Sequence, residues 1–202
     1  KEKMHFTLID PDPKKQSADE AGLRAKLVEK LGSDAIMVGG STNVTISALD
    51  ECVKSIKKNS RLPVILFPSG MSGVSRYADA IFFMSLLNSR DTKWIIKTQA
   101  AAAPIIKKFG LETIPMAYLI IEPGMKAGKV GEAELIKQDE PEKAAEYALA
   151  SQYFGFRFVY LEAGSGATKP VPVEMVKIVR NAIDIPLIVG GGLREPEQIV
   201  ER

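Results

Sequence analysis

Short apolar runs alternate with longer segments of helical periodicity along the whole chain. This alternation is typical of repeated βα units around a parallel sheet. We expect strands at residues 5–9, 35–38, 63–67, 80–84, 114–121, 156–161 and 186–189. We expect helices over residues 17–31, 44–58, 92–109, 141–153 and 173–182, with another beginning at 195. The connection over 69–77 is too short and glycine-rich for a full helix.

Seven βα units fit an α/β fold of the (β/α)8 barrel type that lacks its last unit within these residues. We therefore expect an eighth strand in a segment beyond residue 202, so that residues 1–202 form a single, C-terminally incomplete barrel domain. An open doubly wound sheet is the alternative fold. Both folds place ligands at the carboxyl ends of the strands, so both predict the same location for a site.

The composition argues against several classes of protein. Lys and Arg total 27 against 25 Asp and Glu, and the basic residues are scattered, which gives no electrostatic case for nucleic-acid binding. Cys52 is the single cysteine and His5 the single histidine, so neither an intrachain disulfide nor a histidine-based triad or zinc site is expected. No apolar stretch approaches the roughly 20 residues of a membrane span. We expect a cytoplasmic protein.

The most specific polar segment follows the sixth apolar run and reads Tyr160 to Gly166. A carboxylate such as Glu162 directly after a buried strand costs stability unless it is solvated or paired. It is therefore either part of a site or one half of a buried ion pair, and Tyr160 either donates its hydroxyl there or belongs to the core. The glycines after Glu162, and those at 190–192 after the next strand, would let backbone amides approach an anion such as phosphate.

The first two strands also end in polar residues. Asp10 and Asp12 offer hard oxygen ligands of the kind that Mg²⁺ prefers, although Asp-Pro-Asp could equally form a simple turn. The segment 39–42 could bring a hydroxyl or amides to a phosphate or a metal. Capping of the following helix explains the same residues about as well.

Taken in their order along the chain, these motifs resemble those of geranylgeranylglyceryl phosphate synthases, and most closely the archaeal branch called group II. The resemblance spans nearly the whole chain. It rests on residues 5–12, 37–45, 65–70, 75–80, 85–89 and 160–166.

That resemblance implies a TIM-like barrel in which a loop replaces the third helix. It also implies transfer of a geranylgeranyl group from geranylgeranyl diphosphate to the C3 hydroxyl of sn-glycerol 1-phosphate, the first ether bond of archaeal membrane lipids. Mg²⁺ would be the cofactor, held by Asp10 with Ser41 nearby, and the protein would form a homo-oligomer. Apolar side chains would line a prenyl groove or belong to the core: Leu66, Phe67, Phe83, Met84, Met116, Tyr118 and Ile120.

The resemblance also assigns a glycerol 1-phosphate pocket, in which Glu162 orients the hydroxyls and is, with Asp10, an expected catalytic residue. The expected binding residues are Tyr160, Leu161, Glu162, Ala163, Gly164, Ser165, Gly166, Gly191 and Gly192. Three other functions are compatible with the sequence. They are a heptaprenylglyceryl phosphate synthase with a longer donor, a barrel isomerase or lyase acting on another sugar phosphate, and a non-catalytic phosphate-binding barrel.

Overall fold

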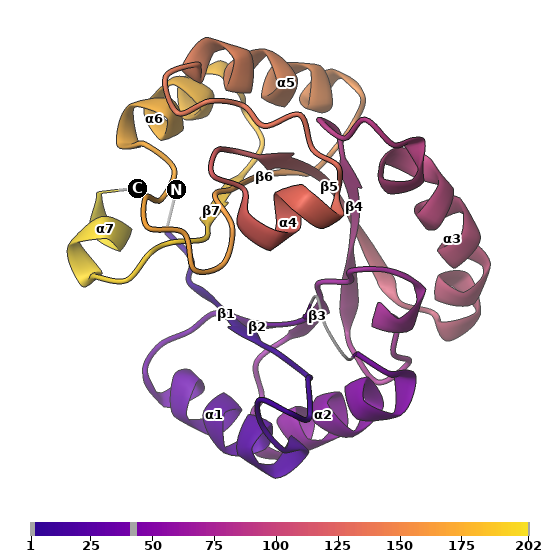
Figure 1. Ribbon diagram of the computed structural model, residues 1–202. Helices are drawn as coiled ribbons and strands as arrows, with labels where there is room; N and C mark the ends of the chain where they lie inside the picture. The colour runs from indigo at the N-terminus through magenta and orange to yellow at the C-terminus, as the bar shows by residue number, and fades with distance from the viewer. Residues whose placement is uncertain (1–2, 41–43, 202) are drawn as a thin grey trace. The chain divides into compact units, whose positions relative to one another are not determined.

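The computed structural model describes residues 3–40 and 44–201. The chain divides into two compact units, one reaching to Phe82 and including Ala100–Thr113, the other formed by Phe83–Gln99 and the residues from Ile114 onward. Strand β4 (Ala80–Leu86) begins in the first unit and ends in the second. Helix α3 (Thr98–Phe109) leads back into the first unit, and strand β5 (Glu112–Ile120) leads into the second again (Figure 1).

The first unit begins with two complete βα repeats, and its third strand is followed by a short turn in place of a helix. Its elements are β1 (Phe6–Ile9), α1 (Ala18–Lys30), β2 (Ala35–Val38), α2 (Ile46–Asn59), β3 (Val64–Leu66), the short 3-10 turn η1 (Met71–Gly73), the start of β4 (Ala80–Leu86), most of α3 (Thr98–Phe109) and the first residues of β5 (Glu112–Ile120).

The second unit continues the same alternation. Its elements are the end of β4, the π-helical turn η2 (Lys93–Lys97), the main part of β5, α4 (Met125–Val130), α5 (Pro141–Tyr153), β6 (Phe158–Glu162), α6 (Val173–Ala182), β7 (Leu187–Gly190) and α7 (Pro196–Val200).

The strands are ordered in the sheet as they are in the chain, from β1 to β7. In the first unit β1, β2, β3 and β4 pair in parallel, and in the second β5, β6 and β7 do so. A doubly wound sheet reverses its strand order at a switch point, whereas the strands of a TIM-like fold follow one another. The order therefore confirms the TIM-like α/β prediction over the open alternative.

Most predicted elements lie within one or two residues of the observed ones, and α5 and α6 match the predicted ranges. The connection over 69–77 contains only the three-residue turn η1, as predicted. Two details differ. The helix expected over 92–109 begins as the π-helical turn η2, and the short helix α4 was not predicted because its six residues, with Gly128 among them, carry no helical periodicity.

Local sequence explains how α1 begins and how closely it packs. Ser17 accepts a hydrogen bond from the Glu20 amide while the Glu20 carboxylate accepts one from the Ser17 amide, which forms a capping box. Gly22 faces α2 so closely that a Cβ there would lie 2.5 Å from Ser55 Oγ. The two helices lie side by side in the first unit (Figure 1).

Asn88 fixes the end of β5 in the second unit. Its side chain is buried, accepts a hydrogen bond from the Ile120 amide at 3.0 Å and donates to the carbonyls of Ile120 and Glu134 at 2.9 and 2.8 Å. One side-chain amide thus bonds three main-chain groups around the end of β5, of which the Ile120 carbonyl also accepts from the Ile136 amide at 3.2 Å. In the β5–β6 register, Ile120 lies opposite Glu162.

We predict that Asn88→Ala lowers the free energy of unfolding by roughly 2–4 kcal/mol, because it removes three hydrogen bonds to main chain and takes from the buried Ile120 amide the acceptor that Asn88 provides. Chemical denaturation monitored by circular dichroism measures this change. Asn181→Ala, at an exposed position on α6, is the matched control and should stay within about 0.5 kcal/mol of the parent. Equal stability of the two variants would contradict the role assigned to Asn88.

Candidate functional site

The last residues of β6 divide between two environments. Val159 and Leu161 belong to the hydrophobic core of the second unit, while Tyr160 and Glu162, two residues apart, lie on the other face of the strand. Glu162 is only 7% exposed. In the register it lies between Ile120 of β5 and Gly190 of β7, at the carboxyl ends of all three strands.

Neutral donors hold both oxygens of the Glu162 carboxylate. The Tyr118 hydroxyl donates to Oε2 at 3.0 Å, and the Gly164 amide donates to Oε1 at 2.6 Å. The Tyr160 hydroxyl also forms a hydrogen bond with this carboxylate. Among the described residues no cation forms an ion pair with Glu162. The structure therefore excludes the buried-ion-pair interpretation for the part of the chain that it describes.

Burial dominates the ionisation of this group. Loss of solvation raises the pKa of Glu162, and the hydrogen bonds from Gly164, Tyr118 and Tyr160 oppose this by stabilising the anion. Burial also raises the pKa of both phenols, and the nearby Glu162 charge adds to that rise. Both tyrosines therefore stay protonated as hydrogen-bond donors. A carboxylate of this kind can accept a further hydrogen bond from a ligand hydroxyl.

Glycines bring main chain up against the carboxylate. A Cβ at Gly190 would collide with the Tyr160 hydroxyl, and one at Gly191 would collide with Glu162 Oε1 and lie 2.6 Å from the Gly164 amide nitrogen. Gly191 also has a φ of 80°, which disfavours other residues. The turn after β6 and the turn after β7 therefore meet beside Glu162, and only glycine fits at their closest approach.

The other residues predicted for this pocket are distributed around the same two turns. Leu161 and Ala163 have no exposed surface and their side chains pack in the core, so only their main chain could contact a ligand. Ser165 and Gly166 are exposed, and Gly192 lies with its Cα beside Ala167. Arg194 donates to the Gly166 carbonyl at 3.2 Å, which links the two turns.

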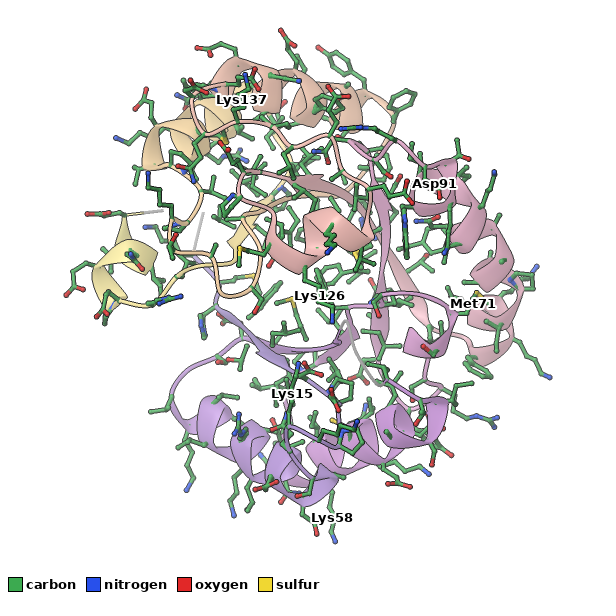
Figure 2. The ribbon with its side chains drawn as sticks, viewed as in Figure 1. Lys15, Lys58, Met71, Asp91, Lys126 and Lys137 are labelled. Atoms are coloured by element: carbon green, nitrogen blue, oxygen red, sulfur yellow. The ribbon has the colours of Figure 1, made fainter. Side chains whose placement is uncertain are left out.

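Asp10 is the centre of a second polar group, in the first unit. The ammonium of Lys15, a residue labelled in Figure 2, contacts its Oδ2. The Asp12 amide donates to its Oδ1 at 3.0 Å. A Cβ at Gly40 would collide with Oδ1, so the carboxylate packs directly against Gly40 and any side chain at that position would displace it. The carboxylate pairs with one cation, the Lys15 ammonium, and its hard oxygens are of the kind that Mg²⁺ prefers.

Asp12 has a different role from Asp10. It is 2% exposed, its carboxylate accepts from the Lys14 amide at 3.0 Å, and its carbonyl accepts from the Lys15 amide at 2.9 Å. These are turn contacts, as the alternative interpretation expected. Ser41, the other predicted metal ligand, lies outside the described residues. Within them, no three His, Cys, Asp or Glu side chains gather around a common point suitable for a metal ion.

Sequence reasoning missed two residues of the Glu162 site. Tyr118 was grouped with apolar lining or core, although it donates to Glu162 and packs edge-on against Tyr160 with ring centroids 5.3 Å apart. Gly190 was noted only as part of a glycine run. The period-two pattern of β5 could have placed Tyr118 on the same face as Ile120, but its pairing with Glu162 depends on the strand register.

Comparisons with known proteins bear on the whole chain. The model of the PcrB family matches residues 1–202. The chain is 59% identical over 198 residues to a geranylgeranylglyceryl phosphate synthase of Pyrococcus horikoshii, which covers 98% of this chain and 77% of that protein. A protein of the same name from Thermococcus gammatolerans is also 59% identical, and the match covers 98% of this chain and 78% of that protein.

None of the helices that the structure describes combines the length and the apolar character of a membrane span.

Two solved structures share the fold. Wild-type GGGPS from Thermoplasma volcanium superposes with a TM-score of 0.95 at 51% identity, covering 99% of this chain and 80% of that one. The (S)-3-O-geranylgeranylglyceryl phosphate synthase from Thermoplasma acidophilum, solved with its substrate sn-glycerol-1-phosphate, gives 0.95 at 48% identity, covering 98% and 80%. The full-length match to the family model and the identity to these relatives together show that this chain belongs to the PcrB family.

Proposed function

We propose that this protein transfers a geranylgeranyl group from geranylgeranyl diphosphate to the C3 hydroxyl of sn-glycerol 1-phosphate. The observation that carries the proposal is the buried Glu162 carboxylate, held by neutral donors beside two glycine turns. Support comes from relatives at 59% identity that are named for this product, and from a similar structure solved with glycerol 1-phosphate.

The Glu162 site suits both ends of glycerol 1-phosphate. The carboxylate can accept hydrogen bonds from the glycerol hydroxyls, and its own two phenol partners keep it oriented. The glycine turns at Gly164, Gly191 and Gly192 have positive φ, and backbone amides in such turns bind anions well. The Gly164 amide itself already donates to Glu162, so the amides of Gly191 and Gly192 are the ones we assign to the phosphate. We assign the acceptor substrate to these residues.

We further propose that the reaction depends on Mg²⁺, with Asp10 as its protein carboxylate. The hard oxygens of Asp10 suit this cation, and the carboxylate already pairs with a positive charge, the Lys15 ammonium, which a bound metal ion would displace. A single carboxylate is enough, because Mg²⁺ commonly takes one or two and fills its other positions with water and substrate phosphates. When bound, Mg²⁺ supplies positive charge that stabilises the departing diphosphate.

The protein's contribution to the chemistry is mainly to position the acceptor. The bond between prenyl C1 and the diphosphate oxygen breaks, and a bond from the glycerol C3 oxygen to prenyl C1 forms. The hydroxyl proton leaves, and Glu162 is the buried base suited to receive it because its pKa is raised. The double bond next to C1 stabilises the positive charge that develops there, so aiming the hydroxyl and excluding water are what the protein must provide.

An assay with radiolabelled glycerol 1-phosphate and prenyl diphosphates of increasing length tests the proposal. We expect ether product with the geranylgeranyl donor and Mg²⁺. Product only with longer donors would replace the proposed donor, and absence of product with every donor would refute the transferase function. Turnover of another sugar phosphate without any prenyl donor would favour an isomerase or lyase.

The sequence also predicts a homo-oligomer. A light-scattering measurement of the mass in solution tests this prediction.

We predict that Asp10→Asn lowers the rate at fixed Mg²⁺ by roughly 100-fold, because the amide has the shape of the carboxylate without its charge. The rate should recover in part as the Mg²⁺ concentration is increased. Steady-state kinetics over a Mg²⁺ titration measures both effects. Asp139→Asn, at an exposed position before α5, is the control and should behave as the parent. A parent-like Mg²⁺ dependence in Asp10→Asn would remove Asp10 from the metal site.

We predict that Glu162→Gln raises KM for glycerol 1-phosphate by roughly 10- to 100-fold and leaves KM for the prenyl donor unchanged, because a hydrogen bond to a charged group is worth about 1.5–3 kcal/mol. In the parent protein, KM for glycerol 1-phosphate should rise as the pH falls through the raised pKa of Glu162, since protonation there removes the anion.

The variant has no carboxyl to protonate, so its KM should stay high and flat over the same pH range. Kinetics of both proteins across that range test the assignment. Glu146→Gln, exposed on α5, is the matched control and should keep the parent profile. A pH-dependent KM that survives in Glu162→Gln would show that another group titrates.

A further inference from the structure

Gln16 is an unusual loop residue, because it precedes α1 and yet is only 8% exposed. Its side-chain Nε2 donates to the Asp10 carbonyl at 2.6 Å. Its amide donates to the Asp12 carbonyl at 3.2 Å, so the same residue also closes the turn that follows Asp10. Two hydrogen bonds therefore connect Gln16 to the loop that carries the Asp10 carboxylate.

The Oε1 atom of the Gln16 side chain takes no part in either bond. This oxygen is buried and accepts no hydrogen bond from any residue that the structure describes. Asp10, Gln16, Glu51 and Cys52 all line one small cavity between this loop and α2. Asp10 and Gln16 are therefore neighbours around one cavity as well as hydrogen-bond partners.

The Cys52 thiol lines the same cavity but is not a candidate ligand for a cation. Burial raises the pKa of Cys52 to about 12, and the nearby negative charge of Asp10 adds to the rise. Cys52 stays a neutral thiol at ordinary pH and holds no cation. Among the side chains lining the cavity, Gln16 is the one hydrogen-bonded to Asp10 itself in the described part of the chain.

We propose that Gln16 is a positioning residue, which fixes the Asp10 loop so that the carboxylate presents its oxygens to a magnesium-bound diphosphate. The inference rests on the magnesium role proposed for Asp10. Mg²⁺ demands near-ideal octahedral geometry, so a small displacement of an oxygen ligand is costly. Loss of a residue that orients a metal ligand typically weakens metal binding by about 10- to 100-fold.

Calorimetric titration of the protein with magnesium inorganic diphosphate tests this without any turnover. Gln16→Met keeps the length and volume of the side chain and removes its hydrogen-bonding atoms. We expect its affinity for magnesium diphosphate to fall by about tenfold or more. Affinity for glycerol 1-phosphate, titrated separately, should be unchanged, because Gln16 takes no part in the Glu162 site. In turnover, added Mg²⁺ should restore the rate of the variant.

Gln138→Met is the matched control. Gln138 Nε2 also donates to a main-chain carbonyl, that of Glu122 at 3.0 Å, but in the second unit. This variant should bind magnesium diphosphate as the parent does. If Gln16→Met does not fold, as judged by loss of glycerol 1-phosphate binding and of cooperative melting, Gln16→Leu takes its place.

Each outcome decides a different point. Parent-like binding by Gln16→Met, together with weakened binding by Asp10→Asn in the same titration, would overturn the inference and leave the magnesium role of Asp10 intact. Parent-like binding by Asp10→Asn would overturn that role and the inference with it. Equal loss of both ligands in folded Gln16 variants would show a general structural role and would also overturn the inference.

Discussion

A carboxylate buried among neutral hydrogen-bond donors is the constraint on which the second unit depends. Glu162 loses its solvation at the end of β6, and among the described residues the hydroxyls of Tyr118 and Tyr160 and the amide of Gly164 offset that loss. An unpaired buried carboxylate would cost several kcal/mol, so these donors must be placed accurately. Parallel pairing places them accurately, because it puts the carboxyl ends of β5, β6 and β7 side by side at the same edge of the sheet.

The same constraint explains the glycines around this carboxylate. Hydrogen bonds of 2.6 to 3.0 Å leave no room for side chains between the turns after β6 and β7. Gly164, Gly190 and Gly191 are therefore needed by geometry before any ligand is considered. A pocket built in this way presents main-chain amides and one carboxylate, which is a surface suited to a small molecule that carries both hydroxyls and a phosphate.

Much of the fold could be predicted from the sequence, because apolar runs and helical periodicity are local signals. Strand β2 and helices α5 and α6 were placed correctly for this reason. The short α4 and the π-helical turn η2 were not, because neither leaves a periodic pattern. For the site, the sequence indicated Glu162 and Asp10 from their positions after strands. It could not indicate Tyr118 or Gln16, whose importance arises only from contacts that folding creates.

The contact between Lys15 and Asp10 has a thermodynamic consequence. A tethered ammonium neutralises this carboxylate, so any free cation must first compete with a charge that is covalently part of the protein. An anion arriving with the cation changes the balance, because it offers the displaced ammonium a new partner. In the magnesium site that we propose at Asp10, cation and anion would therefore favour each other's binding.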